Sequence, residues 1–190
     1  MKLYLSVIGI AMAVISAVNI AAHTAPWYFV IPAVIWCTAL QFALDGFIAF
    51  VIHRIPDRYF SPDNPRYQVS EWERKLYRKL KVRHWKDSVW ELGGLGGFSK
   101  KELREPDNPE YIEQFIVECN KGVLTHRLSY PVGFAAMLTV PGICALTAAL
   151  PVAVVNLFLN ILPTLALRYN TPMLRSVLKR MRRKTETKPK

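Results

Sequence analysis

The sequence lacks the motifs that identify several classes of enzyme. It has three cysteines without a Cys-x-x-Cys pair and four histidines without a His-Glu-x-x-His spacing, so we predict no metal site and no cofactor. It has no Gly-x-Ser-x-Gly elbow and no Walker loop. His53 and Asp57 are one residue too close for the His-x-x-x-x-Asp motif of soluble-headed glycerolipid acyltransferases, and His84 and Asp87 are closer still. Neither His53 nor His84 has an evident partner in the sequence.

Charge is absent from long parts of the chain. The stretch from Leu3 to Ala22 has no charged residue, the stretch from Trp27 to Ile52 has only Asp45, and the stretch from Leu128 to Leu167 has none. Because about 20 apolar residues cross a bilayer, the first two stretches predict one span each and the third predicts two. The predicted fold class is an all-α membrane protein with four transmembrane helices and a cytoplasmic, interfacial cap of amphipathic helices and loops.

Two boundaries inside the apolar stretches stay open. Pro141-Gly142 and Pro151 are the candidate breaks between the third and fourth spans. The first stretch is either a retained signal anchor or a cleaved signal peptide ending in "AVNIAAHTA". We favour the anchor, because the apolar run exceeds the roughly 7–15 residues of a usual signal peptide.

The net charge of +11 is unevenly distributed. The connector 23–26 has no Lys or Arg, whereas 53–127 has fifteen and the segment from Arg168 onward has nine. The positive-inside rule therefore predicts a multi-pass protein of the cell membrane with both termini in the cytoplasm. Twelve acidic residues accompany the fifteen basic ones of 53–127, so we expect anionic lipid headgroups, and not nucleic acid, as the partner of the basic surface.

These patterns divide the chain into four parts. We expect two N-terminal transmembrane helices, an interfacial cap, a transmembrane helical hairpin and a basic cytoplasmic tail, at 1–52, 53–127, 128–169 and 170–190.

The middle of the chain is rich in polar groups. Ser70 and Glu73 have the spacing of a capping box and predict a helix over 71–86. One face of this helix carries apolar residues, which is typical of a helix lying in the membrane interface. They are Trp72, Leu76, Tyr77, Leu80 and Trp85. The glycine cluster in "ELGGLGGFSK" is either a flexible turn or a backbone loop that approaches a phosphate or oxyanion.

A second polar helix is predicted from Asn108, a suitable N-cap, and Pro109. It carries Glu118 and His126, which lie eight residues apart. In a straight helix this spacing means about 12 Å of rise and about 80° of rotation, so the two side chains cannot hydrogen-bond directly. Either Gly122 breaks the helix, or the two residues flank a substrate.

Five segments occur in an order that resembles a known bacterial family. They are "RIPDRYF" (54–60), "VRHWKD" (82–87), "GGFSKKEL" (96–103), "IEQFIVECNKGVLTH" (112–126) and "NILPTLALRYNTPMLRSVLKRMRRK" (160–184). Together they resemble the glycosyl-4,4'-diaponeurosporenoate acyltransferase family over roughly 50–184. Four positions depart from the family's pattern, namely Val123, Arg127, Leu167 and Thr171.

The resemblance implies a membrane enzyme that transfers a fatty acyl group to a sugar hydroxyl of a glycosylated C30 carotenoid or a similar glycolipid. The implied partners are a lipid acceptor and an acyl donor, for which acyl-CoA is a candidate co-substrate. Two alternatives are a non-catalytic membrane scaffold or lipid-binding protein, and a transacylase or hydrolase acting on another membrane lipid.

The matching segments supply the candidate site residues, each with a structural alternative. His126 is the candidate general base or an interfacial histidine bonded to a carbonyl. Glu118 orients the base, binds the sugar or is a solvated carboxylate, and Asp57 is a third catalytic candidate or a loop cap. Arg83 and Lys86 are candidates for neutralising phosphates of the donor, or for headgroup contact. The predicted substrate-binding residues are Arg83, Trp85, Lys86, Asp87, Arg168, Tyr169 and Asn170. Asp45 is interpreted as the cytoplasmic end of a tilted span.

Overall fold

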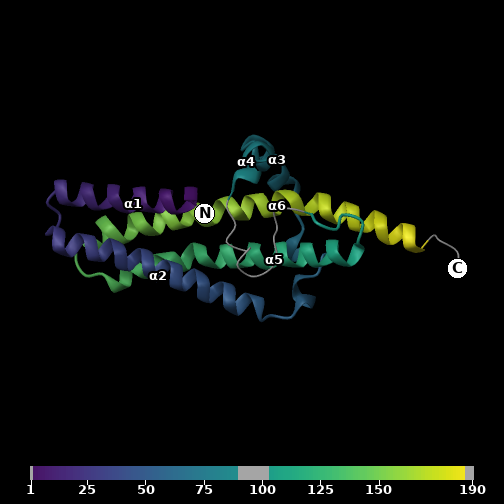
Figure 1. Ribbon diagram of the computed structural model, residues 1–190, viewed down its shortest axis with the longest axis horizontal. Helices are drawn as coiled ribbons and strands as arrows, with labels where there is room; N and C mark the ends of the chain where they lie inside the picture. Colours follow the sequence, from purple (N-terminus) through teal and green to yellow (C-terminus); the bar gives the residue numbers. More distant parts are fainter. Residues whose placement is uncertain (1, 90–102, 187–190) are drawn as a thin grey trace. The chain divides into compact units, whose positions relative to one another are not determined.

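The computed structural model describes residues 2–89 and 103–186, and within these ranges the chain is helical without any β-strand (Figure 1). The all-α prediction is therefore confirmed for the described residues. The glycine cluster of the sequence falls at 93–97, outside these ranges.

Three helices in the described ranges are long and apolar enough to cross a membrane, so the prediction of four transmembrane helices is wrong. Helix α1 spans Lys2–Ala21 and α2 spans Trp27–His53. The third candidate span is Ala145–Lys184, which contains α6 (Leu150–Glu186).

The missing helix is the first half of the apolar stretch that begins at Leu128. Helix α5 (Pro109–Val132) draws most of its residues from the polar segment before that stretch, so it has no sufficiently long apolar window. The chain then continues as the 3₁₀-helix η5 (Gly133–Thr139), turns at Gly142 with φ +63°, and resumes as the π-helical η6 (Ala145–Ala149). Short helices of these types commonly mark irregular connections rather than long spans.

Of the two proposed break points, Pro141-Gly142 is the turn and Pro151 is not. Pro151 is the second residue of α6, which continues directly from the π-helical η6, so this proline is accommodated within one helical stretch and does not end it.

The predicted helix over 71–86 is interrupted. The capping box of Ser70 and Glu73 is present at the start of α3 (Glu71–Lys79), but Lys81 adopts φ +50° and separates α3 from α4 (Val82–Trp85). The indole Nε1 of Trp85 donates to the carbonyl of Leu80 at 2.9 Å, which satisfies an acceptor at the end of α3. The break comes from this local capping, which the apolar periodicity did not reveal.

The chain divides into two compact units. Unit 1 comprises Met1–Val51 and Thr125–Ile161, and unit 2 comprises Ile52–Leu124 and Leu162–Lys190. Helices α2, α5 and α6 each contribute residues to both units.

The core of unit 1 consists mainly of small side chains from α2 and from the segment between α5 and α6. Two side-chain hydrogen bonds attach that segment to α2: Gln41 Nε2 donates to the carbonyl of Gly133 at 3.1 Å, and Trp36 Nε1 donates to Thr139 Oγ1 at 3.0 Å. The buried core residues are Val30, Ala33, Val34, Cys37, Ala136, Val140, Cys144, Ala148, Ala149 and Val152. Small residues let helices approach closely where lipid supplies no hydrophobic drive.

The core of unit 2 lies between α5 and α6. Its apolar residues recur at helical spacing on both helices, as expected for two facing amphipathic stripes. They are Ile112, Phe115, Ile116, Cys119, Val123, Leu167, Leu174 and Leu178. Helix α5 begins as predicted, because the side chain of Asn108 accepts hydrogen bonds from the backbone N–H groups of Glu110 and Tyr111.

Candidate functional site

Unit 1 contains a chain of three polar side chains that ends on a histidine. His126 of α5 lies with Nδ1 2.8 Å from Asn160 Oδ1 of α6. Asn160 Nδ2 in turn donates to Asp45 Oδ2 of α2 at 3.2 Å. Three helices therefore bring an imidazole, an amide and a carboxylate into one hydrogen-bonded line.

The hydrogen bonds of Asn160 define the tautomer of His126. The amide nitrogen of Asn160 donates to Asp45 Oδ2 and to both oxygens of Asn156, which directs its amide oxygen to the imidazole. An amide oxygen accepts and does not donate, so Nδ1 of His126 carries the proton. In the neutral ring the lone pair then resides on Nε2, which is the arrangement required of a general base.

The line of polar groups lies among other buried polar atoms of unit 1. Asp45 Oδ1, Ser129 Oγ and Asn156 Nδ2 are buried and have no hydrogen-bond partner in the described structure. Buried donors and acceptors are normally satisfied, so these atoms indicate a place where a ligand or water is bound. Asn156 also packs closely against Gly133. A Cβ added at Gly133 would lie 3.0 Å from Asn156 Nδ2.

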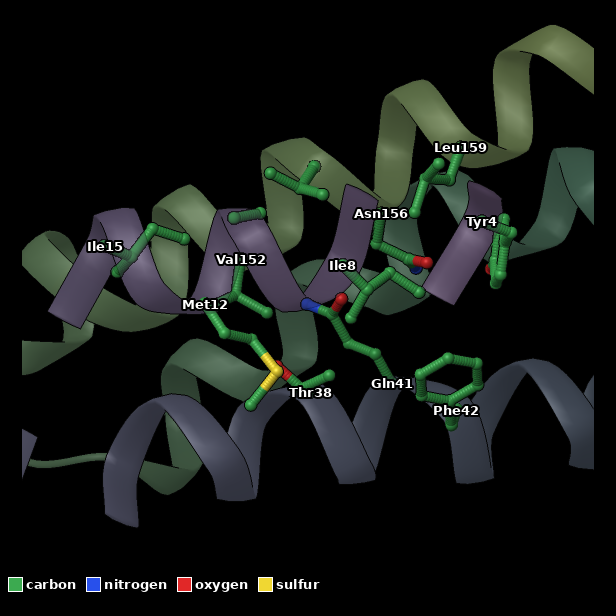
Figure 2. A pocket seen from close by; sticks show the side chains of 12 residues that line it. Tyr4, Ile8, Met12, Ile15, Thr38, Gln41, Phe42, Val152, Asn156 and Leu159 are labelled. Carbon is green, nitrogen blue, oxygen red and sulfur yellow. The ribbon is translucent and has the colours of Figure 1, made fainter. Parts of the chain in front are cut away.

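A small cavity of unit 1 adjoins Asn156. Figure 2 shows it lined by side chains of α1, α2 and α6, with Gln41, Thr38 and Asn156 among mainly apolar neighbours. Its volume is about 30 Å³. A cavity needs only about 10–15 Å³ of this kind of volume to hold one water molecule, so this cavity can hold ordered water.

Unit 2 contains a second cluster of ionisable groups, around Lys121 of α5. Its ammonium lies 2.6 Å from Asp57 Oδ1 and 3.3 Å from Glu118 Oε1. The other oxygen of Glu118 is 3.5 Å from His53 Nε2. The expectation that His53 lacks a partner is therefore wrong.

Lys121 is itself deeply buried, at 5% exposure. Burial alone would lower the pKa of its ammonium, but the hydrogen bond and charge of Asp57, together with Glu118, outweigh burial and raise the pKa. The 3₁₀-helix η1 (Asp57–Phe60), which carries Asp57, is fixed to α5 by a second contact, from Asn120 Nδ2 to the carbonyl of Phe60 at 2.8 Å. Lys121 therefore remains a cation that holds the two carboxylates.

Glu118 and His126 do not meet through a break in α5. The helix is continuous from Pro109 to Val132, including Gly122. Glu118 belongs to unit 2 and His126 to unit 1, and each has its own partners there. The first of the two open arrangements, a helix break at Gly122, is thus not adopted.

Arg168 lies in unit 2 and clamps α6 to α3. Its Nε and Nη2 donate to the two carboxylate oxygens of Glu73, both at 2.6 Å, and Nη2 also donates to the carbonyl of Gln68 at 3.0 Å. Burial alone would raise the pKa of Glu73, but the bonds from Arg168 and from the Ser70 N–H outweigh it and lower the pKa to about 2. Such a two-pronged pair fixes geometry as well as charge.

The other predicted substrate-binding residues also fall in unit 2. Four of them, Arg83, Lys86, Tyr169 and Asn170, line one large groove. Lys86 pairs with the exposed Asp87 at 2.6 Å, and the ring of Tyr169 meets that of Tyr77 edge-on. Trp85 is the residue that caps α3.

Sequence reasoning missed two members of the line in unit 1. Asp45 was interpreted as the end of a span, and Asn160 was not considered. The available signal was the pair Asn156 and Asn160, two amides spaced one helical turn apart in an otherwise apolar run. Within 2–89 and 103–186 no group of three His, Cys, Asp or Glu side chains is arranged to hold a metal ion.

Comparison with known protein families identifies a family that matches most of the chain. The family described as glycosyl-4,4'-diaponeurosporenoate acyltransferase matches residues 56–180. No curated protein and no solved structure matches the chain. The matched range includes His126 and Asn160 and excludes Asp45.

Proposed function

The chain belongs to the glycosyl-4,4'-diaponeurosporenoate acyltransferase family, and from this premise we propose that it transfers a fatty acyl group from a thioester donor to a sugar hydroxyl of a membrane glycolipid. The acceptor we propose is a glycosylated C30 carotenoid of the glycosyl-4,4'-diaponeurosporenoate type. The observation that carries the proposal for this chain is the line from His126 through Asn160 to Asp45.

A sugar hydroxyl is a poor nucleophile at neutral pH, so the transfer needs a base within hydrogen-bond distance. In the proposed step, Nε2 of His126 takes the hydroxyl proton while the oxygen attacks the thioester carbonyl. The tetrahedral adduct then expels the thiolate, which takes the proton from the imidazolium. The products are a sugar ester and a free thiol, and His126 returns to its starting form.

Asn160 and Asp45 act on His126 as positioning residues. The amide fixes the ring and its tautomer through Nδ1. The carboxylate orients the amide and offsets the positive charge that develops on the imidazole during the reaction. A carboxylate between apolar helices is costly, which favours a functional reason for Asp45.

The orientation that we propose keeps both basic regions of the chain in the cytoplasm, as the Lys and Arg distribution favours. It is supported by contacts within unit 1. The segment after α5 contacts Gln41, then Trp36, and then Asn19, whose Nδ2 donates to the carbonyl of Thr147 at 2.7 Å. It thus follows α2 back toward the connector between α1 and α2. Three apolar helices and a return segment that is a 3₁₀-helix at Gly133–Thr139 and turns at Gly142 are compatible with both basic regions on one side.

The proposed chemistry is tested by acyl transfer from a labelled acyl thioester to a glycolipid extract, using purified His126→Ala and His53→Ala proteins. We expect His126→Ala to lose at least ~10²-fold in turnover, because general-base catalysis typically contributes 10²–10⁴-fold. His53→Ala is the matched control, since His53 also lies beside a carboxylate, in unit 2. If His53→Ala lost turnover and His126→Ala did not, the general base would be His53 in unit 2 and not His126.

The role of Asn160 has a readout of its own. Asn160→Ala removes the acceptor of the Nδ1 proton and the link to Asp45. Turnover should fall less than in His126→Ala, and the acid limb of its pH profile should move to lower pH, because an unsupported imidazole is less basic. If the pH profile of Asn160→Ala matched that of the wild type, Asn160 would contribute to packing and not to the basicity of His126.

A further inference from the structure

Unit 2 contains a large groove whose walls are strongly basic. It lies between the segment with α3 and α4 on one side and the second half of α6 on the other, and its volume is about 1350 Å³. The first wall contributes Arg74, Arg78, Arg83 and Lys86. We call this cavity the basic groove.

The α6 wall of the basic groove is equally cationic. It contributes Arg175, Lys179, Arg182 and Arg183. Asp63 is the one acidic residue among the described lining residues. An excess of like charges around one cavity disfavours the empty state and favours an anionic occupant.

Several of these cations have no carboxylate of their own. Arg182 pairs with Glu113 at 2.8 Å and with Asp63 at 3.5 Å, and Lys86 pairs with Asp87. In contrast, no ion pair within 2–89 and 103–186 involves Arg78, Arg83, Arg175 or Lys179. Both walls of the groove therefore offer uncommitted charge.

Arg175 is the most informative of the four. Its Nε and Nη2 are buried and have no hydrogen-bond partner in the described structure. The carboxylate that acts on its charge is Asp63, which also lies 3.5 Å from Arg182 and makes no hydrogen bond to these two nitrogens. Buried guanidinium donors without acceptors are rare in folded proteins, so an acceptor from outside the chain is expected here. Phosphate and carboxylate oxygens match the fork of a guanidinium best.

We propose that the basic groove binds the phosphate groups of the acyl donor, a thioester of the coenzyme A type, with Arg175 at its buried end. The identity of the donor rests on the proposed acyl transfer, whereas phosphate binding does not. A phosphate monoester carries about −1.5 to −2 charges at neutral pH, and coenzyme A adds a diphosphate to it, so uncommitted cations on two walls suit it better than a single headgroup phosphate.

The groove also offers hydrogen-bonding groups suited to the rest of a nucleotide. Tyr169, Asn170 and Ser176 line it beside the cations. Four of the residues predicted from sequence to contact substrate, Arg83, Lys86, Tyr169 and Asn170, would thereby contact the same ligand. The groove is far larger than the cavity beside Asn156, and it has room for a molecule of this size.

The test is the binding of coenzyme A itself to the purified full-length protein in detergent, measured by isothermal titration. Arg175→Gln should weaken binding by at least ~10-fold, the usual consequence of removing a charge-assisted hydrogen bond. Arg180→Gln is the matched control, because it removes the same charge from the same helix and does not line the groove. Arg83→Gln, on the exposed opposite wall, should also weaken binding and does not disturb a buried site.

Two further arms identify the source of the phosphate. Phosphatidylglycerol in mixed micelles should not displace coenzyme A, and removing the 3'-phosphate of coenzyme A should weaken its binding. Displacement by the lipid, or equal binding by the Arg175→Gln and Arg180→Gln proteins, would overturn the proposal. Acyl transfer by a protein that does not bind coenzyme A would also overturn it and leave the proposed function standing. Arg175-dependent binding without acyl transfer would instead refute only the proposed function.

Discussion

The ion pair between Glu73 and Arg168 should contribute to the free energy of unfolding by an amount that follows from the lowered pKa of Glu73. The pKa of Glu73 is lowered from 4.5 to about 2, by Arg168 and the N–H of Ser70 acting against burial. Since one pKa unit corresponds to about 1.4 kcal/mol, the ionised carboxylate contributes about 3 kcal/mol of folding free energy at neutral pH. The Glu73 side chain is only 16% exposed, so solvent screening of this contribution is small.

Glu73→Gln should therefore destabilise the protein by about 3 kcal/mol at pH 7, and by more if the buried Arg168 is left uncompensated. A carboxylate with a lowered pKa contributes its stability above the unfolded pKa of 4.5 and loses it as the pH falls toward about 2. The difference between the variant and the wild type should accordingly narrow below pH 4.5. The measurement is chemical denaturation in detergent micelles, followed by tryptophan fluorescence at several pH values.

The control for this experiment is Glu71→Gln. Glu71 is on the same helix and pairs with Arg74 at 3.0 Å, but its side chain is 75% exposed. Such surface pairs contribute little, so Glu71→Gln should stay within about 1 kcal/mol of the wild type. Equal stability of the Glu73 and Glu71 variants would refute the assignment of Arg168 as a clamp, and would free it for the substrate role suggested by the sequence.

Two further predictions concern the membrane. With the buried native cysteines replaced, an external thiol reagent should label a cysteine at position 24 and not one at position 99, because the connector 23–26 lacks Lys and Arg and 53–127 is rich in them; the opposite pattern would invert the orientation. Trp72→Glu combined with Leu76→Glu should weaken membrane-bound activity, because the exposed Trp72 suits the interface; unchanged activity, with both positions open to aqueous quenchers, would place α3 in water.

Local features of the fold were predictable from the sequence because they depend on neighbours in the chain. The caps formed by Ser70 with Glu73 and by Asn108 follow from short-range hydrogen bonding, and both are present. The apolar helices α1 and α2 follow from length and composition, as does the apolar half of α6. These properties require no knowledge of which elements pack together.

Predictions from the sequence were wrong where tertiary packing, and not the local sequence, determines the backbone conformation. Composition alone made the stretch after Leu128 long enough for two spans, but side chains of α2 hold its first half as a 3₁₀-helix and a turn. Likewise, the periodicity over 71–86 did not reveal the break at Lys81, where Trp85 folds back onto Leu80. In both places the backbone depends on a side chain several residues away or in another helix.

The candidate site was predictable in part for the same reason. Histidine chemistry and a position between polar and apolar sequence indicated His126. Its partners, Asn160 and Asp45, come from helices 34 residues later and 81 residues earlier in the chain, and only the three-dimensional pairing relates them. Arg175 was equally hidden, because its significance lies in two buried guanidinium nitrogens that have no hydrogen-bond partner in the described structure.

The central claim is that this chain adds one acyl group to a membrane glycolipid with His126 as the base. The most direct test is lipid mass spectrometry of a deletion strain that carries either the wild-type gene or the His126→Ala gene. We expect the deletion and the His126→Ala strain to lose the same glycolipid and to accumulate its partner lighter by one acyl group, with the wild-type gene restoring it. A lipid profile without any difference of one acyl mass, or full restoration by the His126→Ala gene at equal protein level, would contradict the account.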